Sequence, residues 1–335
     1  MLELVKTCDL CGGSAFEPAF NGKNFEFNEE FTILECKNCR LLFVSPRPDP
    51  SVIGKYYQSG NYYAYQDTSQ LRGLKNLLEH FKNWLYRIHY QKNKNVFEGL
   101  SSLFGRIILS FFPTLPPKAK LGSLLDVGCG SGSFMARLKQ AGWNVTGVEI
   151  DPAAVVIAER NALEVYRGEL TAVEFGSKRF DVILFSQVLE HVYSPAAYLK
   201  RAKQLLAQDG ILLIGIPNPE CWLAKFFGIY WRAWDLPRHL YHFKKDALLE
   251  YMEKTNLKLV SIKRHHILLS LRLILKDLKL KAQDKRGTFS LFIPIYVVAV
   301  FLYILNLALY LCPGVDTNIT SHYLTYLVRQ RSALD

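Results

Sequence analysis

Short apolar runs alternate with helical patterns through the middle and the end of the chain. The predicted strands are Leu124–Val127, Asn144–Val148, Leu163–Tyr166, Arg179–Phe185, Ile211–Ile216, Leu257–Lys263 and Tyr323–Val328. The first five are short and apolar and are separated by helical stretches, which predicts buried parallel strands joined by crossover helices. The last two follow a helix predicted at Lys244–Asn256 and are expected to form an antiparallel pair. The pattern therefore indicates an α/β fold built on one sheet.

A glycine-rich turn follows the first of these strands. The sequence Asp126-Val127-Gly128-Cys129-Gly130-Ser131-Gly132 leads into a helix that begins near Ser133. Glycines at alternate positions let the backbone turn sharply and let a ligand approach it closely. The acid that precedes them suits a ligand with an amine. Glu149, at the end of the next strand, can accept hydrogen bonds from both hydroxyls of a ribose.

These residues resemble the first motif and the ribose-binding acid of the class I S-adenosylmethionine-dependent methyltransferases. The resemblance implies a Rossmann-like α/β fold with a seven-stranded sheet of strand order 3-2-1-4-5-7-6, and S-adenosylmethionine as cofactor. It places the cofactor contacts at Asp126, Gly128, Cys129, Gly130, Gly132, Glu149, Ile150, Glu169 and Gln187. The alternative is a purely structural turn in another Rossmann-like domain.

A second motif follows the fourth strand, in Ser186–Val192. Its Leu-Glu-His-Val sequence is similar to the L-E-H-V motif of the same family, at the sheet edge where ligands bind in open α/β folds. Glu190 and His191 are therefore candidates for acid–base catalysis. The alternative is that they only orient this loop. Relatives that methylate quinone precursors have an acid three residues before the glutamate and bind a metal there, whereas this chain has Gln187.

The segment 217–243 is rich in aromatic residues and is predicted to be a substrate insertion. Its end, Asp235–Phe243, has the pattern D-x-P-R-H-L-x-H-F, which also resembles a subgroup of these methyltransferases. The aromatic side chains are expected to wall an apolar pocket. His239 is a candidate base or orienting residue, and Arg238 could bind a substrate anion. His242 is more simply explained as a structural histidine.

Four N-terminal cysteines have the spacing of a metal site. Cys8 and Cys11 form one C-x-x-C pair, and Cys36 and Cys39 form another. Four thiolates at this spacing suit tetrahedral zinc, and a four-cysteine site has no open position for water, so a structural role is expected. Disulfides are the alternative, which a reduced intracellular setting disfavours. A zinc ribbon at residues 1–50 is also found in the methyltransferase subgroup noted above.

The remaining segments complete the expected domain organisation. With 335 residues, of which 50% are hydrophobic, about two domains are expected. Residues 51–118 are predicted to be a tyrosine-rich helical linker or cap, with amphipathic helices at 71–112. The methyltransferase domain is expected at 119–266 and 320–335, with an apolar helical insertion at 267–319.

Charge and hydropathy indicate contact with a membrane. The formal net charge is +11, and two basic blocks, Arg72–Lys120 and Lys258–Arg286, are interleaved with apolar residues. Leu291–Cys312 carries no charge and would span about 33 Å as a helix. A hairpin that dips into one leaflet is favoured, packing on the protein is second, and a true span is third. No signal peptide is visible, so a cytoplasmic, peripherally membrane-associated enzyme is expected.

The predicted activity is S-adenosylmethionine-dependent methyl transfer to oxygen or carbon of a small, apolar, lipid-like or lipid-linked acceptor. Two alternatives remain open. One is an RNA methyltransferase, which fits the basic charge but lacks a basic and aromatic surface away from the apolar segments. The other is a non-catalytic, cofactor-binding membrane adaptor. The sequence does not identify the acceptor or the oligomeric state.

Overall fold

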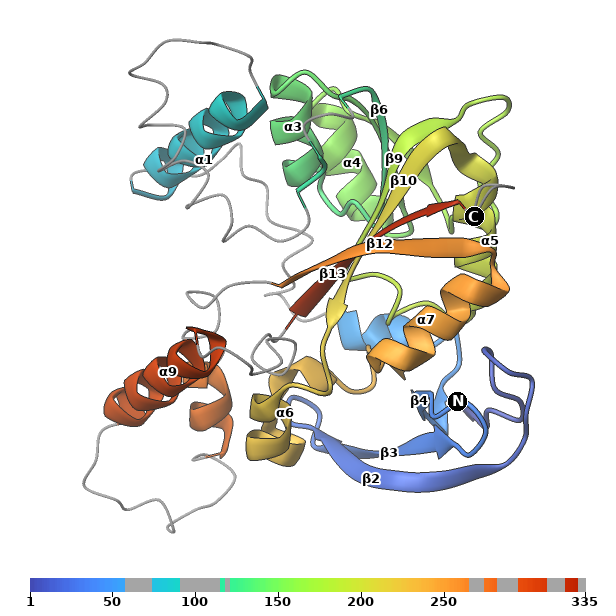
Figure 1. Ribbon diagram of the computed structural model, residues 1–335, viewed down its shortest axis with the longest axis vertical. Helices are drawn as coiled ribbons and strands as arrows, with labels where there is room; N and C mark the ends of the chain where they lie inside the picture. The colour runs from blue at the N-terminus through green and yellow to red at the C-terminus, as the bar shows by residue number, and fades with distance from the viewer. Residues whose placement is uncertain are drawn as a thin grey trace.

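Two β-sheets and three hydrophobic cores organise the protein in the computed structural model (Figure 1). The structure describes residues 1–57, 74–90, 115–117, 121–264, 274–281, 295–311 and 323–330. The predicted helices over 91–112, and parts of the predicted insertion at 267–319, lie outside the described residues.

The larger sheet has seven strands in the order β12-β13-β10-β9-β6-β7-β8. Its strands are β6 (Ser123–Val127), β7 (Asn144–Glu149), β8 (Glu164–Arg167), β9 (Phe180–Ser186), β10 (Leu206–Pro217), β12 (Leu257–Arg264) and β13 (Tyr323–Gln330). Numbered along the chain, this is the predicted order 3-2-1-4-5-7-6 read from the other edge. β13 is antiparallel to both of its neighbours, and the other pairs are parallel. The predicted fold class is therefore confirmed.

One strand differs from its predicted start. β10 begins at Leu206 rather than at Ile211, because Leu206 already pairs with Phe180 before the register shifts ahead of Ile211. The residues between them form an irregularity within the strand. The correction follows from pairing with a neighbouring strand, which local turn signals do not reveal.

Helices cover both faces of this sheet (Figure 1). The helices are α1 (Leu74–Tyr90), α3 (Ser133–Gln140), α4 (Pro152–Arg160), α5 (Pro195–Leu205) and α7 (Lys245–Lys254). One core joins the sheet to α1, α3 and α4, and another joins it to α5 and α7. The second core also contains Cys8 and Cys36, so the cysteine region packs directly on the methyltransferase fold.

The N-terminal region forms an antiparallel sheet of order β11-β4-β3-β2. It contains β2 (Phe16–Asn24), β3 (Glu29–Cys36), β4 (Leu42–Val44) and the distant β11 (Tyr241–His242). A separate pair, β1 (Leu2–Glu3) with β5 (Arg47–Pro48), and the 3-10 helix η1 (Ile53–Tyr57) complete this region. β11 thus joins the 217–243 segment to the N-terminal sheet.

A third core joins this sheet to the apolar helices of the second half of the chain. These are α6 (Trp222–Phe227), η5 (Gly228–Tyr230), η6 (Arg232–Trp234), a helix at 274–281 and α9 (Ile295–Leu311). Tyr230, Trp231 and Trp234 are buried in this core, although an aromatic pocket wall was expected. Within the described part of the chain, no helix has both the length and the apolar character needed to cross a membrane.

Candidate active site

The glycine-rich turn connects β6 to the N-terminus of α3. Gly128, Gly130 and Gly132 all have positive φ, at 68°, 54° and 76°, which favours glycine at each position. A Cβ on Gly128 would lie 2.6 Å from the Val188 side chain. Larger residues would therefore strain the backbone and displace the loop that follows β9. The predicted turn is found where a ligand can approach the backbone closely.

Two carboxylates border this turn. Glu149, at the end of β7, accepts hydrogen bonds from Gly130 N (2.8 Å) and Asp151 N (2.9 Å), which fix its side chain beside the loop. Asp126 is buried, and no described cation pairs with it. Burial, and secondarily the charge of Glu149, raise the pKa of Asp126 to about 8. A buried acid without a cation fits a ligand that brings its own positive charge.

The other predicted cofactor residues lie around the same strand ends. Ile150 exposes 63% of its surface directly after β7, so it can cover an apolar ligand face. Gln187 has a φ of 59°, and its N–H donates to Gly215 O at 2.8 Å. Burial raises the pKa of the Cys129 thiol, which disfavours the reactive thiolate form. Glu169 follows β8, and its carbonyl accepts from Ala172 N and Val173 N.

Glu190, His191 and His239 come together from two distant segments. One nitrogen of each histidine and one carboxylate oxygen of Glu190 all lie within 4.8 Å of one another. The two imidazole rings meet edge to face with centroids 4.6 Å apart. The carboxylate of Glu190 is buried, and both of its oxygens lack a hydrogen-bond partner among the described residues. A buried, unpartnered carboxylate is costly and indicates a position prepared for a ligand.

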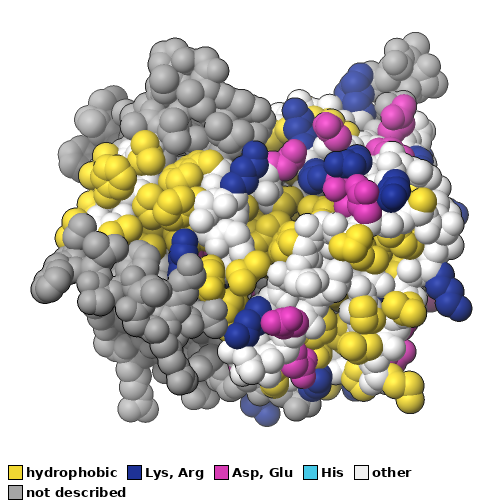
Figure 2. All heavy atoms as spheres, turned by 90° about the horizontal axis from the view of Figure 1, so that it is seen from below, with side chains coloured by type: hydrophobic (Ala, Val, Ile, Leu, Met, Phe, Trp, Pro, Cys, Tyr) yellow, Lys and Arg dark blue, Asp and Glu magenta, His cyan; other side chains and the backbone are white. Residues whose placement is uncertain are grey.

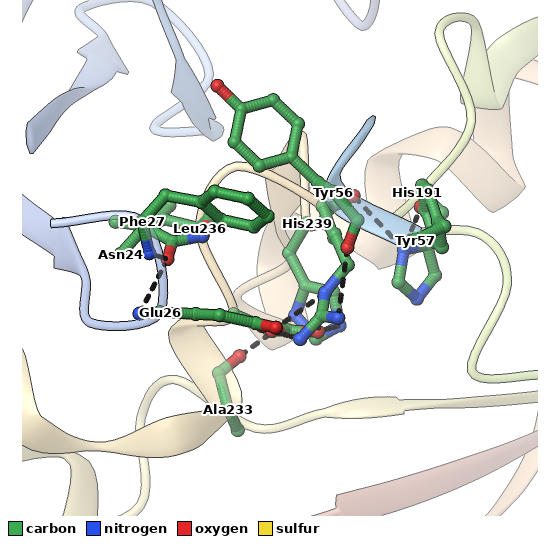
Figure 3. Close-up of polar contacts among 11 residues, drawn as sticks. Asn24, Glu26, Phe27, Tyr56, Tyr57, His191, Ala233, Leu236 and His239 are labelled. Carbon is green, nitrogen blue, oxygen red and sulfur yellow. Dashed lines mark hydrogen bonds and ion pairs between the residues drawn. The ribbon is translucent and has the colours of Figure 1, made fainter. Parts of the chain in front are cut away.

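Backbone carbonyls set the tautomer of both histidines. Nδ1 of His191 lies 3.0 Å from Arg238 O and 3.0 Å from the hydroxyl of Tyr57, and Nδ1 of His239 lies 2.9 Å from Ala233 O (Figure 3). A carbonyl can only accept, so each Nδ1 carries the proton and each Nε2 keeps its lone pair. Burial lowers the pKa of His191 to about 3 and lowers the pKa of His239, so both are neutral at physiological pH.

The spacing of this cluster favours an oxygen atom over a metal ion as its occupant. Hydrogen bonds of about 2.8 Å to one oxygen place the bonded atoms about 4.6 Å apart at a tetrahedral angle. Bonds of about 2.1 Å to one zinc ion would place them only about 3.4 Å apart. The three groups lie within 4.8 Å, yet Glu190 forms neither a hydrogen bond nor an ion pair with a described side chain. This separation disfavours a shared zinc ion, and the three groups offer acceptors of which a hydroxyl, with its single proton, can use one at a time.

Tyr57, Arg238 and Asp235 surround the cluster. Tyr57 comes from η1 and stacks at a tilt on His191, and only its tyrosine-rich setting pointed toward the site. Arg238 was expected to meet a substrate anion. Instead, its guanidinium binds the carboxylate of Asp235 and donates to Tyr56 O at 3.2 Å. Asp235 also lies 3.7 Å from Nε2 of His239.

The four predicted metal-site cysteines are gathered at one point. Sγ of Cys8 lies 3.5 Å from Sγ of Cys39, and Sγ of Cys11 lies 3.5 Å from Sγ of Cys36. All four sulfurs are within 4.8 Å of one another, and none is in a disulfide. Zinc–sulfur bonds of about 2.3 Å would separate neighbouring sulfurs by about 3.8 Å. The donor set and its spacing therefore fit one tetrahedral zinc ion.

Comparison with known proteins agrees with this geometry. A family model described as "Methyltransferase domain" matches residues 93–262. A ubiquinone biosynthesis O-methyltransferase of Actinobacillus pleuropneumoniae is 29% identical over 161 residues, which cover 43% of this chain and 68% of that protein. One from Cereibacter sphaeroides is 30% identical over 146 residues, covering 40% and 59%.

Among solved structures, the [4+2]-cyclase SpnF aligns over 77% of this chain and 95% of its own, with 15% identity and a TM-score of 0.44. A geranyl diphosphate methyltransferase in complex with SAM aligns over 70% and 86%, with 15% identity and a TM-score of 0.42.

Proposed function

This chain belongs to the class I S-adenosylmethionine-dependent methyltransferases, and we propose that it methylates a hydroxyl of a small, lipid-like acceptor. The single observation that carries the proposal is the buried, unpartnered carboxylate of Glu190 beside His191 and His239. The relatives named for ubiquinone biosynthesis O-methylation support an apolar acceptor and transfer to oxygen.

We assign the cofactor to the turn after β6 and the end of β7. The Asp126 carboxylate would bind the ammonium group, because it is buried and has no cation of its own. Glu149 would accept the ribose hydroxyls, since each of its oxygens keeps a lone pair after binding the backbone. The other contacts would come from the glycine loop, Cys129, Ile150, Glu169 and Gln187. When bound, S-adenosylmethionine supplies a methyl group on a positively charged sulfur, which an aligned nucleophile can displace.

Glu190, His191 and His239, together called the acceptor cluster, would orient the hydroxyl of the substrate and remove its proton. The neutral histidines hold lone pairs on Nε2, but a hydroxyl has a single proton and can donate it to only one group. Burial raises the pKa of Glu190 to about 8, so this carboxyl ionises close to physiological pH. Glu190 is therefore the better-matched base, and it would take the hydroxyl proton as the acceptor oxygen bonds to the methyl carbon, the carbon–sulfur bond breaks and the neutral thioether leaves.

We further propose that Cys8, Cys11, Cys36 and Cys39 hold a structural zinc ion. A site with four thiolates leaves no coordination position for water or substrate. The zinc would therefore stabilise the N-terminal sheet and take no part in the chemistry. Its contribution would be largest there, because a single ion joins the beginning of the chain to the turn before β4.

A membrane surface is the proposed source of the acceptor. On α9, the exposed apolar residues are Val297, Val300, Phe301, Ile304 and Leu305. Their spacing of three and four residues makes one stripe, while Ala299 and Leu302 face the third core. Figure 2 displays hydrophobic side chains gathered on the side of the molecule where α9 lies in Figure 1. Lys281 lies over the ring of the exposed Phe226 and adds positive charge beside this stripe.

Transfer of a radiolabelled methyl group tests the proposed function. The purified protein would be incubated with labelled S-adenosylmethionine and separate lipid, small-metabolite and RNA fractions. Label is expected in an organic-extractable product that alkaline hydrolysis and mass spectrometry identify as a methyl ether. Label found only in RNA, or in no fraction despite cofactor binding, would contradict the proposal.

A further inference from the structure

The acceptor cluster consists of two parts that the N-terminal region holds separately. Glu190 and His191 lie on the loop between β9 and α5, and His239 lies just before β11. Neither part is a regular element of the large sheet. The distance between these two parts therefore depends on the contacts that each makes with residues 1–57.

The turn at Cys8–Cys11, here called the first cysteine knuckle, contacts the end of the loop that bears Glu190 and His191. Asp9, between Cys8 and Cys11, accepts hydrogen bonds from Ser194 Oγ at 2.7 Å and from Ala196 N at 2.9 Å. Ser194 occupies the N-cap position of α5 but makes no side-chain capping bond of its own. Asp9 thus caps α5 from a distant part of the chain and places a negative charge at the helix N-terminus.

The same carboxylate also accepts from Tyr251 Oη of α7 at 2.9 Å. Close by, Lys254 Nζ donates to Leu10 O at 2.9 Å. Farther along the loop, Tyr193 Oη donates to Pro48 O at 2.8 Å. The knuckle is therefore docked on both helices of this face of the sheet.

The turn at Cys36–Cys39, the second cysteine knuckle, is connected through β4 to the segment that bears His239. Cys36 N donates to Leu41 O at 3.0 Å, so the knuckle leads directly into β4. β4 pairs with β11, and Val44 N donates to Leu240 O at 2.9 Å. On its other side, Leu240 N donates to Glu190 O at 2.8 Å. His239 is thus carried on a strand held between β4 and the backbone of Glu190.

We propose that the four-cysteine centre sets the geometry of the acceptor site, and that Asp9 is the positioning residue of the first knuckle. The two knuckles support opposite parts of the cluster, and the metal ion that joins them would fix their separation. The cofactor turn is joined to β7, because Gly128 N donates to Val148 O and Gly130 N donates to Glu149 Oε2, so we expect it to keep its geometry without this support. The inference rests on the proposed role of Glu190, His191 and His239.

Hydrogen exchange measured by mass spectrometry tests this proposal without knowledge of the acceptor. The full-length, zinc-loaded wild type would be compared with Asp9→Asn. The variant loses charge-assisted hydrogen bonds at the α5 N-terminus, so exchange in 187–196 and 236–242 is expected to rise by about tenfold to a hundredfold. Exchange in β6 and β7, zinc content and the calorimetric affinity for S-adenosylmethionine are expected to stay unchanged.

Asp49→Asn is the matched control, because Asp49 lies in the same region but, among the described residues, its side chain accepts only from Ser51. It should leave all of these readouts at wild-type values. If Asp9→Asn does not fold, Ser194→Ala removes one of the three contacts and should produce a smaller rise in the same two segments. Unchanged exchange there, or an equal rise in β6 and β7, would overturn the proposal. Absence of methyl transfer alone would count against the proposed function instead.

Discussion

The two ends of the candidate active site are built in different ways. The cofactor end comes from one continuous β-α-β unit, in which Asp126, the glycine loop and Glu149 are fixed by β6, α3 and β7. The acceptor end is assembled from three separate segments, which contribute Tyr57, the Glu190–His191 loop and His239. The first end depends on local backbone geometry, and the second depends on how the N-terminal sheet docks.

This difference indicates how one fold can serve many acceptors. A local motif can be kept while distant segments change around it, because its geometry is set within one β-α-β unit. The same difference makes the acceptor end sensitive to changes in distant segments. An assembled site is only as rigid as the contacts that hold its parts, and here those contacts reach the cysteine knuckles. Variants at the two ends should therefore affect separable steps.

The largest effect is expected from Glu190→Gln. Removing the proposed base should lower the rate of methyl transfer by about 10²- to 10⁴-fold. The affinity for S-adenosylmethionine should stay within about twofold of wild type, because Glu190 lies outside the cofactor end. Steady-state kinetics together with calorimetry would measure both quantities.

The pH profile of that reaction sharpens the same assignment. Because burial raises the pKa of Glu190 to about 8, the carboxylate form increases as the pH rises toward 8, and the rate should rise with it. Glu253→Gln, the same change on an exposed position of α7, should leave the profile unaltered. A Glu190→Gln variant that keeps the wild-type rate and profile would remove Glu190 from the mechanism.

The second-largest effect is expected on the affinity for S-adenosylmethionine, which should depend on the protonation of Asp126. In the free protein the pKa of Asp126 is raised to about 8, so at pH 6.5 its carboxyl is mostly protonated. A bound ammonium group favours the carboxylate, so binding should release a proton, and affinity should rise by up to about tenfold per pH unit until pH 8. Calorimetry at pH 6.5 in buffers of different ionisation enthalpy measures this release. Equal heats in both buffers would contradict the assigned partner of Asp126.

The smallest effect is expected at the α9 stripe. Phe301 is 64% exposed, and a buried Phe side chain contributes about 1.5–3 kcal/mol. Phe301→Asp should therefore weaken binding to vesicles that contain phosphatidylglycerol by about tenfold or more in a sedimentation assay. Val156→Asp, at an exposed apolar position of α4, should bind as wild type does. If both variants bind equally well, α9 is not the membrane contact.

Local patterns were sufficient to predict most of the large sheet. Short apolar runs predicted its seven strands, and helices follow β6, β7, β9 and β10 as the pattern indicated. The early start of β10 was missed because it depends on pairing between Leu206 and Phe180. The aromatic residues of 217–243 were expected to line a pocket, but Trp231 and Trp234 pack in the third core. Composition does not reveal which side of a segment faces the protein.

The residues of the candidate site also fall into those that local spacing predicted and those that only the tertiary fold brings together. The spacing of Asp126, Gly128 and Glu149 is a local signal, and the structure places them together. Glu190 and His239 were each singled out as catalytic candidates, but nothing in the sequence indicated that they share one position. Asp9 carried no signal at all, because its role arises only when the first knuckle docks on α5. Long-range contacts of this kind follow from the tertiary fold.

Calorimetric titration of S-adenosylmethionine into the wild type, Glu149→Gln and Glu190→Gln tests the separation of the two ends most directly. We expect one site on the wild type, the same affinity for Glu190→Gln, and an affinity lower by about tenfold to a hundredfold for Glu149→Gln, which loses hydrogen bonds to a charged group. Thermal unfolding of each variant would control for folding. No binding to the wild type, or equal weakening by both substitutions, would contradict the account.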